Sequence, residues 1–480
     1  MMNNNFRSNE RGSVLIWTVL TMLILSLLGA EVLRAVSGRY QLGIQSAKWQ
    51  ESLIAAESGV DLAVVELRKS LYPAPNGAWS GWDNTPGNGV IGHGLTTVPT
   101  EGLAATPMSI EVAVDAPAQL VDPSNGWQYY RIRTLGSVPL PGAPRVGFNK
   151  GDNRLRKLTL RTQRSVDNLF ASETTDPHAA RRIEAVVKPV SSFNMAILAI
   201  GNLDLNNQNI RIDSYDSRDD AKSTLGLYDA AKFQQNGNIA TDGSVLEAGG
   251  AQVYGSVSTN NGTATGVQNV TGEQRTDFYQ DPIPIGAPTW SSINPTPFTV
   301  NGNATISASS TEGSASSRYL LSAIKLDNKT LTLAGNADGS PSYIEIHVTG
   351  DIDVKGSGQI ILGDGVKATI YFDQNLDIAG NGILNPQSQP SNLLLYGVQP
   401  DPNENYHANL GGNGTITAAL YAPGHAVKVN GGGTNGHVFG SVVGKTVTMT
   451  GVTNLHYDEA LSSGGLINNY QIVSWVEDTR

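Results

Sequence analysis

The feature that most constrains this chain is an uncharged apolar segment close to its N-terminus. Ser13 to Ala30 contains no Asp, Glu, Lys or Arg. At about 1.5 Å of helical rise per residue, this segment approaches the roughly 30 Å hydrocarbon core of a bilayer. Arg7 and Arg11 precede it, and the positive-inside rule then places the N-terminus in the cytoplasm and the remainder outside. The segment therefore predicts a single-pass membrane helix.

A cleaved secretory signal is the alternative interpretation of this segment. Such a signal needs small residues at the first and third positions before the cut. Cutting after Ala30 puts Leu28 at the third position, and cutting after Gly29 puts Leu27 there. Both arrangements fit poorly, so a retained helix is favoured.

Helical periodicity continues beyond the apolar segment. Apolar residues recur at three- and four-residue steps from Leu53 to Leu71, a spacing typical of one face of a helix. Pro73 ends the pattern. We therefore expect one long helix over 13–71, with a membrane half and an amphipathic half. This design suits a helix bundled inside a filament, and a membrane anchor with a helical stalk is the simpler alternative.

The start of this helix resembles a processing signal. Arg11-Gly12-Ser13 followed by an unbroken apolar run resembles a type IV prepilin leader. The resemblance implies that residues 1–12 are a leader, that a prepilin peptidase cuts after Gly12, and that the mature chain begins at Ser13.

The whole helix also resembles a particular class of pilins. Arg11 to Leu71, with Ala55-Ala56-Glu57-Ser58-Gly59 late in the helix, is similar to the N-terminal segment of PilX-like pilus assembly proteins, which are minor pilins. Trp17 stands where major pilins carry Glu, so charge pairing with the neighbouring subunit's N-terminus is unavailable. The resemblance therefore implies a rare, tip or priming position, or an anchored protein that stays outside the fibre.

Residues 72–190 are expected to form a small antiparallel sheet, the arrangement that the pilin resemblance implies. Residues 72–105 are rich in Gly, Pro, Asn and Trp and are interpreted as loop. Strand-like runs follow at Met108 to Val114, Trp127 to Leu135, Leu155 to Arg161 and Arg182 to Val190.

Charge is unevenly distributed along the chain. Residues 131–190 hold twelve basic and five acidic side chains (12 − 5 = +7), whereas the whole chain has a net charge of −10. Such a segment could meet an acidic neighbour or an anionic polymer, but a half-exposed sheet face is the favoured interpretation. Few aromatic residues interleave with the charges, and the whole chain is acidic, so no nucleic-acid partner is expected.

The C-terminal half repeats a five-residue pattern of apolar, polar, apolar, any residue and Gly. The copies are Phe298–Gly302, Leu331–Gly335, Ile352–Gly356, Leu376–Gly380, Val427–Gly431 and Val447–Gly451, with an Asn-ended copy at Leu203–Asn207. Several of these starts are 20 to 24 residues apart and other strand-like runs lie between them, which predicts a β-solenoid over 191–462. A β-sandwich is the alternative. The Pro-rich stretch 259–297 is expected to be an insertion or lid, and 463–480 a C-terminal tail.

Residues 195–460 also resemble a C-terminal domain of unknown function found on PilX-like proteins. The similarity lies in Asp213–Ser217, Tyr254–Val257, Ala419–Pro423 and Leu455–Leu461. The resemblance implies a cell-biological class and no reaction.

Carboxylates of this region are the candidates for catalysis, because β-solenoids are a common scaffold for polysaccharide lyases and hydrolases. Hydrolysis needs two facing carboxylates. The candidates are Asp213 with Asp216, Asp219 with Asp220, Asp229, and the run His456-Tyr457-Asp458-Glu459. Such short runs more often cap turns, the seven His lack metal-ligand spacing, and the chain has no Cys. We therefore predict no catalytic residue, no cofactor and no metal site.

The sequence thus predicts a mainly β chain with one long N-terminal helix, a small pilin-like antiparallel sheet and a C-terminal β-solenoid. The favoured function is a non-catalytic, pilus-associated minor pilin in assembly or adhesion, anchored in the inner membrane and displayed in the periplasm or on an extracellular pilus. Its expected partners are other pilins, the assembly machinery, prepilin peptidase, the bilayer and a surface polysaccharide or protein. A membrane-anchored enzyme or binding protein acting on envelope polysaccharide, and a pseudopilin-like component of a secretion system, are the alternatives.

Overall fold

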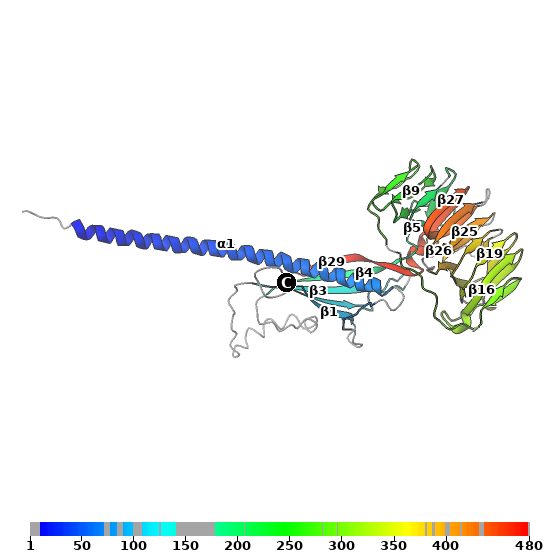
Figure 1. Ribbon diagram of the computed structural model, residues 1–480, viewed down its shortest axis with the longest axis horizontal. Helices are drawn as coiled ribbons and strands as arrows, with labels where there is room; N and C mark the ends of the chain where they lie inside the picture. Colours follow the sequence, from blue (N-terminus) through cyan, green and yellow to red (C-terminus); the bar gives the residue numbers. More distant parts are fainter. Residues whose placement is uncertain are drawn as a thin grey trace, which may run out of the picture.

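The computed structural model combines a long helix, an antiparallel sheet and a large parallel β domain (Figure 1). Helix α1 (Glu10–Lys69) extends far beyond the rest of the molecule with its N-terminal half. The described residues are 10–71, 77–83, 90–98, 108–123, 126–140, 178–205, 207–280, 282–294, 296–379, 382–385, 389–398, 404–412, 415–431 and 436–478. The prediction of a mainly β chain with one long N-terminal helix is confirmed.

The C-terminal half of α1 lies on a five-stranded antiparallel sheet with the order β1-β2-β3-β4-β29. Its strands are β1 (Val90–Val98), β2 (Met108–Asp115), β3 (Tyr130–Pro139), β4 (His178–Ser191) and β29 (Ile467–Asp478). Side chains of β3 alternate between buried and half-buried, because successive residues of a strand point to opposite faces of the sheet. We call α1 and these five strands the helix–sheet unit.

Three of the four strands expected in this region have counterparts in the structure, as β2, β3 and β4. The run Leu155 to Arg161 lies outside the described residues. Strand β1 falls within the stretch that was interpreted as loop, so that interpretation was wrong at residues 90–98. Two glycines interrupt β1, at Gly92 and Gly94, which explains why its sequence indicated a loop.

The last strand of the sheet comes from the far end of the chain. Residues 463–480 were expected to be a tail, but β29 returns from the parallel domain and pairs antiparallel with β4 along its length. Tyr470 of β29 is buried in the core between helix and sheet. The chain therefore crosses between the two parts of the molecule twice, after β4 and before β29.

Within its described residues, the parallel domain contains the remaining strands and three short 3-10 helices. The strands are β5 (Ile197–Ala199), β6 (Leu203–Leu205), β7 (Arg211–Tyr215), β8 (Ile239–Thr241), β9 (Val245–Glu247), β10 (Gln252–Val253), β11 (Val257–Ser258), β12 (Thr263–Thr265), β13 (Gln274–Arg275), β14 (Phe298–Val300), β15 (Ala304–Ser307), β16 (Arg318–Asp327), β17 (Thr330–Ala334), β18 (Ser342–Val348), β19 (Ile352–Lys355), β20 (Gln359–Leu362), β21 (Val366–Phe372), β22 (Leu376–Ile378), β23 (Ile383–Leu384), β24 (Leu393–Gly397), β25 (His407–Gly412), β26 (Ile416–Gly431), β27 (His437–Gly451) and β28 (Asn454–Asp458). The 3-10 helices are η2 (Ala315–Ser317), η3 (Pro390–Asn392) and η5 (Glu459–Ser463).

The prediction of a β-solenoid is wrong: eight parallel strands close on themselves as a barrel, and the other strands are added to it. Strand β16 pairs with β18 along its first half and with β19 along its second half. On the opposite side, β26 pairs with both β24 and β25. Strand β21 pairs with β18 and β24, and β22 pairs with β19 and β25, which closes the ring. We call β5 to η5 the barrel domain.

The five-residue Gly pattern misled this prediction because its copies belong to different sheets. The copy at Leu331 lies in β17, which belongs to a separate four-stranded sheet. The copy at Ile352 lies in β19 of the barrel. The earliest copy, at Leu203, lies in β6, which pairs with β27 near the end of the domain. The spacing of the pattern along the chain does not indicate which other strands each copy will pair with.

The stretch 259–297, expected as an insertion or lid, contains β12 and β13 and then crosses the wall of the barrel. Ile285 forms a parallel bridge with Val398, and the backbone N–H of Ile293 donates to the carbonyl of Arg318. One continuous apolar core fills the barrel domain.

Candidate functional site

Helix α1 has two halves with opposite environments, and the exposed half is the main functional candidate. Its apolar side chains have no cover in the structure: Leu33 is 72% exposed and Met22 is 71% exposed. The helix is long and apolar enough to cross a membrane. An apolar surface of this extent needs a lipid or protein environment.

The residues singled out from the sequence lie in this exposed half. Gly12 and Ser13 are part of the α1 backbone, and the side chain of Ser13 lies outside the described residues. Trp17 is 64% exposed and Ala30 is also exposed. Trp17 therefore projects from the helix, where a neighbouring molecule or lipid could contact it.

The second half of α1 is attached to the sheet through its smallest residues. Ala55, Ala56 and Ala63 are fully buried against β2, β3 and β4. A Cβ added at Gly59 would lie 2.9 Å from Thr134 Cγ2, closer than real carbon contacts allow. The segment Ala55-Ala56-Glu57-Ser58-Gly59 therefore permits a close approach of helix and sheet.

The sheet carries a matching glycine that the sequence reasoning missed. A Cβ on Gly136 in β3 would collide with the carbonyl of Ser52 and would lie 2.6 Å from the backbone nitrogen of Ala56. Glu66 then holds the turn after the helix, because its Oε2 accepts from the backbone N–H of Trp79 at 2.6 Å. The helix is thus rigidly joined to the sheet at one end and unsupported at the other.

Only part of the predicted basic segment lies within the described residues, namely Arg131, Arg133, Arg181, Arg182 and Lys188. Two of these arginines share one carboxylate: Arg131 Nη2 is 2.5 Å and Arg133 Nη2 is 3.6 Å from Asp115 Oδ2. Arg181 Nη1 lies 2.7 Å from Glu477 Oε1, and its guanidinium stacks on Trp49. These ion pairs favour the interpretation that the described basic residues belong to an ordinary half-exposed sheet face.

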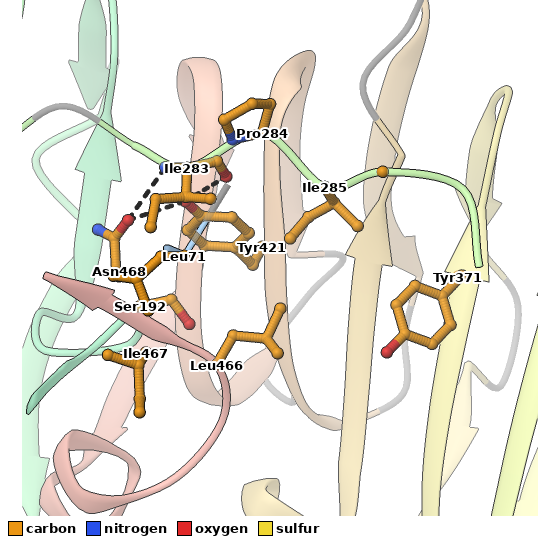
Figure 2. Close-up of a pocket in the computed structure, with 11 residues that line it drawn as sticks. Leu71, Ser192, Ile283, Pro284, Ile285, Tyr371, Tyr421, Leu466, Ile467 and Asn468 are labelled. Atoms are coloured by element: carbon orange, nitrogen blue, oxygen red, sulfur yellow. Dashed lines mark hydrogen bonds between the residues drawn. The ribbon is translucent and has the colours of Figure 1, made fainter. Parts of the chain in front are cut away.

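A cavity of about 230 Å³ lies at the junction between the helix–sheet unit and the barrel domain (Figure 2). Leu71, Ile467 and Tyr371 are among its mostly apolar lining residues. Asn468, at a bulge in the β29–β4 pairing, accepts from the backbone N–H of Ile283 at 3.0 Å through its Oδ1. Figure 2 shows this group at one side of the cavity and Tyr371 at the other.

In the barrel domain, the structure brings together two segments that carry candidate residues, one around Asp213 and the other around His456. Asp213 in β7 lies directly opposite His456 in β28. Asp213 Oδ1 is 2.5 Å from His456 Nδ1, and its Oδ2 accepts from Tyr228 Oη and Arg211 Nε, both at 2.8 Å. Asp213 is completely buried. Its charge is therefore balanced by neighbours that are already in place.

A second imidazole extends this pair, and sequence reasoning did not find it. His437 Nδ1 lies 3.0 Å from His456 Nε2. Burial, and then the neighbouring His456, lowers the pKa of His437. Among the described residues, neither imidazole is hydrogen bonded to a Ser or Thr hydroxyl. The arrangement is a carboxylate–imidazole–imidazole chain.

The other carboxylate candidates cap turns. Asp216, Asp219 and Asp229 each accept from the backbone N–H two residues later, as Asx turns do. Asp458 accepts from the backbone N–H of Ser217 at 3.0 Å, and burial raises the pKa of its carboxyl group.

Two further candidates also make structural contacts. Glu459 Oε1 accepts from the Ser214 hydroxyl at 2.9 Å, and the Asp220 carbonyl accepts from Lys232 Nζ at 2.8 Å. Among the described residues, no three His, Asp or Glu side chains are placed to hold a metal ion.

Comparison with known proteins adds little about activity. Residues 298–463 match a family model described as Domain of unknown function (DUF7305), which spans β14 to η5 of the barrel domain. No curated protein matches the chain. The crystal structure of the competence-associated pilin ComZ from Thermus thermophilus is 13% identical and covers 90% of this chain and 97% of that chain, with a TM-score of 0.26. A TM-score this low does not establish a shared fold, and neither match is to a PilX-like protein.

Proposed function

We propose that this chain is a pilin-like subunit of a type IV pilus system. The observation that carries the proposal is the division of α1 between an exposed apolar half and a half buried on an antiparallel sheet. The exposed half would lie in the inner membrane before assembly and among the helices of neighbouring pilins afterwards. The barrel domain would stand on the outer side of the membrane, beyond the sheet.

The sequence at the start of helix α1 supports the same role. Arg11-Gly12-Ser13 precedes the apolar run as a prepilin leader does, and prepilin peptidase would leave the helix on the mature protein. Trp17 replaces the Glu of major pilins, which favours a minor position in the fibre, such as its tip. The PilX-like class is the specific assignment that we propose.

The barrel domain is proposed to bind rather than to catalyse. The carboxylates of Asp216, Asp219 and Asp229 cap turns, and Asp213 is closed off from solvent. Short strands with polar outward side chains could contact a surface polysaccharide or protein. A hydrolase would need two carboxylates facing an open cleft, and no observation favours that alternative.

The test is the intact mass and N-terminal sequence of the protein from membranes and from sheared surface fibres. We expect a mature chain that begins at Ser13 in both fractions. Gly12→Leu should block the cut and remove the protein from the fibres, whereas Gly29→Leu, in the apolar run, should still be cut. An uncut wild-type chain confined to membranes would contradict the proposal. Processed protein that never reaches fibres would favour a secretion-system pseudopilin.

A further inference from the structure

Strand β29 presents an open edge with an unusual number of exposed apolar side chains. It pairs with β4 on one side, and no other described strand pairs with its outer side. Val473 is 46% exposed, Trp475 is 42% exposed and Val476 is 57% exposed. An apolar edge of this length offers unpaired backbone groups to another strand.

The exposed side chains occupy both faces of the sheet. Trp475 lies opposite Ala185, which is buried in the core under the helix, so Trp475 is on the helix side. Val476 lies opposite the exposed Glu184, on the far side. A strand added at this edge would therefore cover apolar surface above and below the sheet.

Most of each edge strand of the sheet lacks the usual charged protection. From Ile467 to Val476, β29 contains no Pro and no Asp, Glu, Lys or Arg, and β1, at the opposite edge, contains none over Val90–Val98. Natural edges commonly use Lys, Pro or bulges to prevent pairing. Here β29 has bulges near Asn468 and Val473 and two acidic residues at its end, Glu477 and Asp478, and the residues between these features are unprotected.

The directions of the strands indicate which strand would pair with the open edge of β29. Each neighbouring pair in the order β1-β2-β3-β4-β29 is antiparallel, so β1 and β29, at the two edges, run in the same direction. Copies anchored in one membrane have their α1 helices aligned. Placed side by side, such copies bring β29 of one next to β1 of the next, with both strands parallel.

Antiparallel self-pairing of two β29 strands is disfavoured by the same geometry. Antiparallel pairing between two β29 strands would turn one copy end over end. Its helix would then point away from the membrane that anchors the first copy. This step rests on the proposed function, because it uses the common membrane anchor.

We propose that β29 is a lateral assembly surface, which pairs in parallel with β1 of a second copy of this chain. The contact would join the antiparallel sheets of two neighbouring copies into one continuous sheet. It would add backbone hydrogen bonds between sheets to the contacts between helices. The bulge at Val473 would confine the pairing to the segments on either side of it.

Disulfide cross-linking tests this proposal cleanly because the chain has no Cys. One tagged copy carries Ser474→Cys in β29, and a second, differently tagged copy carries Leu95→Cys, Thr96→Cys or Thr97→Cys in β1. A disulfide requires α-carbons within about 7 Å. We expect a strong cross-link at one of these registers in membranes and weak ones at the others. A copy with Ser244→Cys, on an exposed site in the barrel domain, controls for random collision.

An edge-blocking variant gives the second readout. Val476→Lys should lower the yield of cross-link at least about tenfold, because the added strand would have to pack its side chains beside a charged one. Val476→Thr, a small uncharged change, should leave most of the yield. Equal cross-linking at every β1 position and at Ser244, or cross-linking of Ser474→Cys copies only to each other, would overturn the proposal.

The two proposals fail in different ways. Processed, membrane-embedded protein that gives no β29–β1 cross-link would overturn the edge pairing and leave the proposed function intact. A cross-link from β29 to a different pilin would also overturn the pairing between copies. Unprocessed protein would first contradict the proposed function.

Discussion

Gly136 in β3 faces the backbone of Ser52 in α1 so closely that no side chain fits between them. The contact sets the distance between helix and sheet, and the buried alanines of α1 pack in the narrow space that results. Helix α1 can therefore project its apolar half from a fixed base. This relationship is the structural basis for treating α1 as an assembly element.

We predict that Gly136→Ala weakens the attachment of α1 to the sheet. The added methyl group must displace the helix backbone, and overpacking of this kind costs about 1–3 kcal/mol. Hydrogen exchange of the β3 amides measures the effect locally, which suits a chain with more than one domain. Gly38→Ala is the control, since a Cβ there meets no atom within 4 Å. Unchanged β3 exchange in Gly136→Ala would contradict the close packing.

We predict that Trp17→Glu increases the share of the protein found in surface fibres. Trp17 is exposed on α1 and has no charge to pair with the N-terminus of a neighbouring subunit. A buried ion pair between subunits would favour incorporation, by about tenfold for each 1.4 kcal/mol gained. Quantitative blotting of sheared fibres against membranes measures the ratio. Trp17→Leu keeps the position uncharged and should leave the ratio unchanged, and an equal rise in both variants would argue against charge pairing.

We predict that Asp213→Asn strongly destabilises the barrel domain. The substitution leaves Arg211 and His456 without the buried carboxylate that they share, and breaking a buried ion pair costs about 3–5 kcal/mol. Calorimetric unfolding of the full chain measures the loss. Asp219→Asn, in an exposed turn of the same domain, should cost under about 1 kcal/mol. Equal effects of the two substitutions would show that the Asp213 network contributes little.

We predict that His425 makes the barrel domain acid-sensitive. Burial lowers the pKa of His425 to about 4, although its hydrogen bond to the Gln374 carbonyl opposes this. The unfolded chain, with a pKa of about 6.5, binds this proton first, so stability is lost as the pH falls from about 6.5 towards 4. Between pH 7 and pH 5 the loss should be about 2 kcal/mol.

His425→Gln removes this titration and keeps a hydrogen-bond donor. The loss of unfolding free energy between pH 7 and pH 5 should therefore be smaller in the variant by the same amount. The comparison cancels the contributions of other titrating groups. Identical pH dependence in both proteins would mean that another group causes the acid sensitivity.

Some features of this protein could be read from local sequence, and others could not. The 13–71 helix was predictable because apolar periodicity and the absence of charge are local properties. Ala55 and Gly59 were noticed in the sequence, but their partner Gly136 was not, because nothing local indicates which strand will face the helix. His437 was missed for the same reason: it approaches His456 only through the pairing of β27 with β28.

The sequence by itself determined the membrane-length helix, the strand-rich remainder and the absence of cysteine chemistry. Tertiary structure decided that β29 returns to complete the first sheet. It also decided that β16 pairs with both β18 and β19, that β26 pairs with both β24 and β25, and that Asp213 is buried beside His456. Alternation of apolar and polar residues specifies a strand and its buried face. It does not specify the neighbouring strand, because many strands of similar pattern bury the same apolar area, and only the packing of the whole chain selects among them.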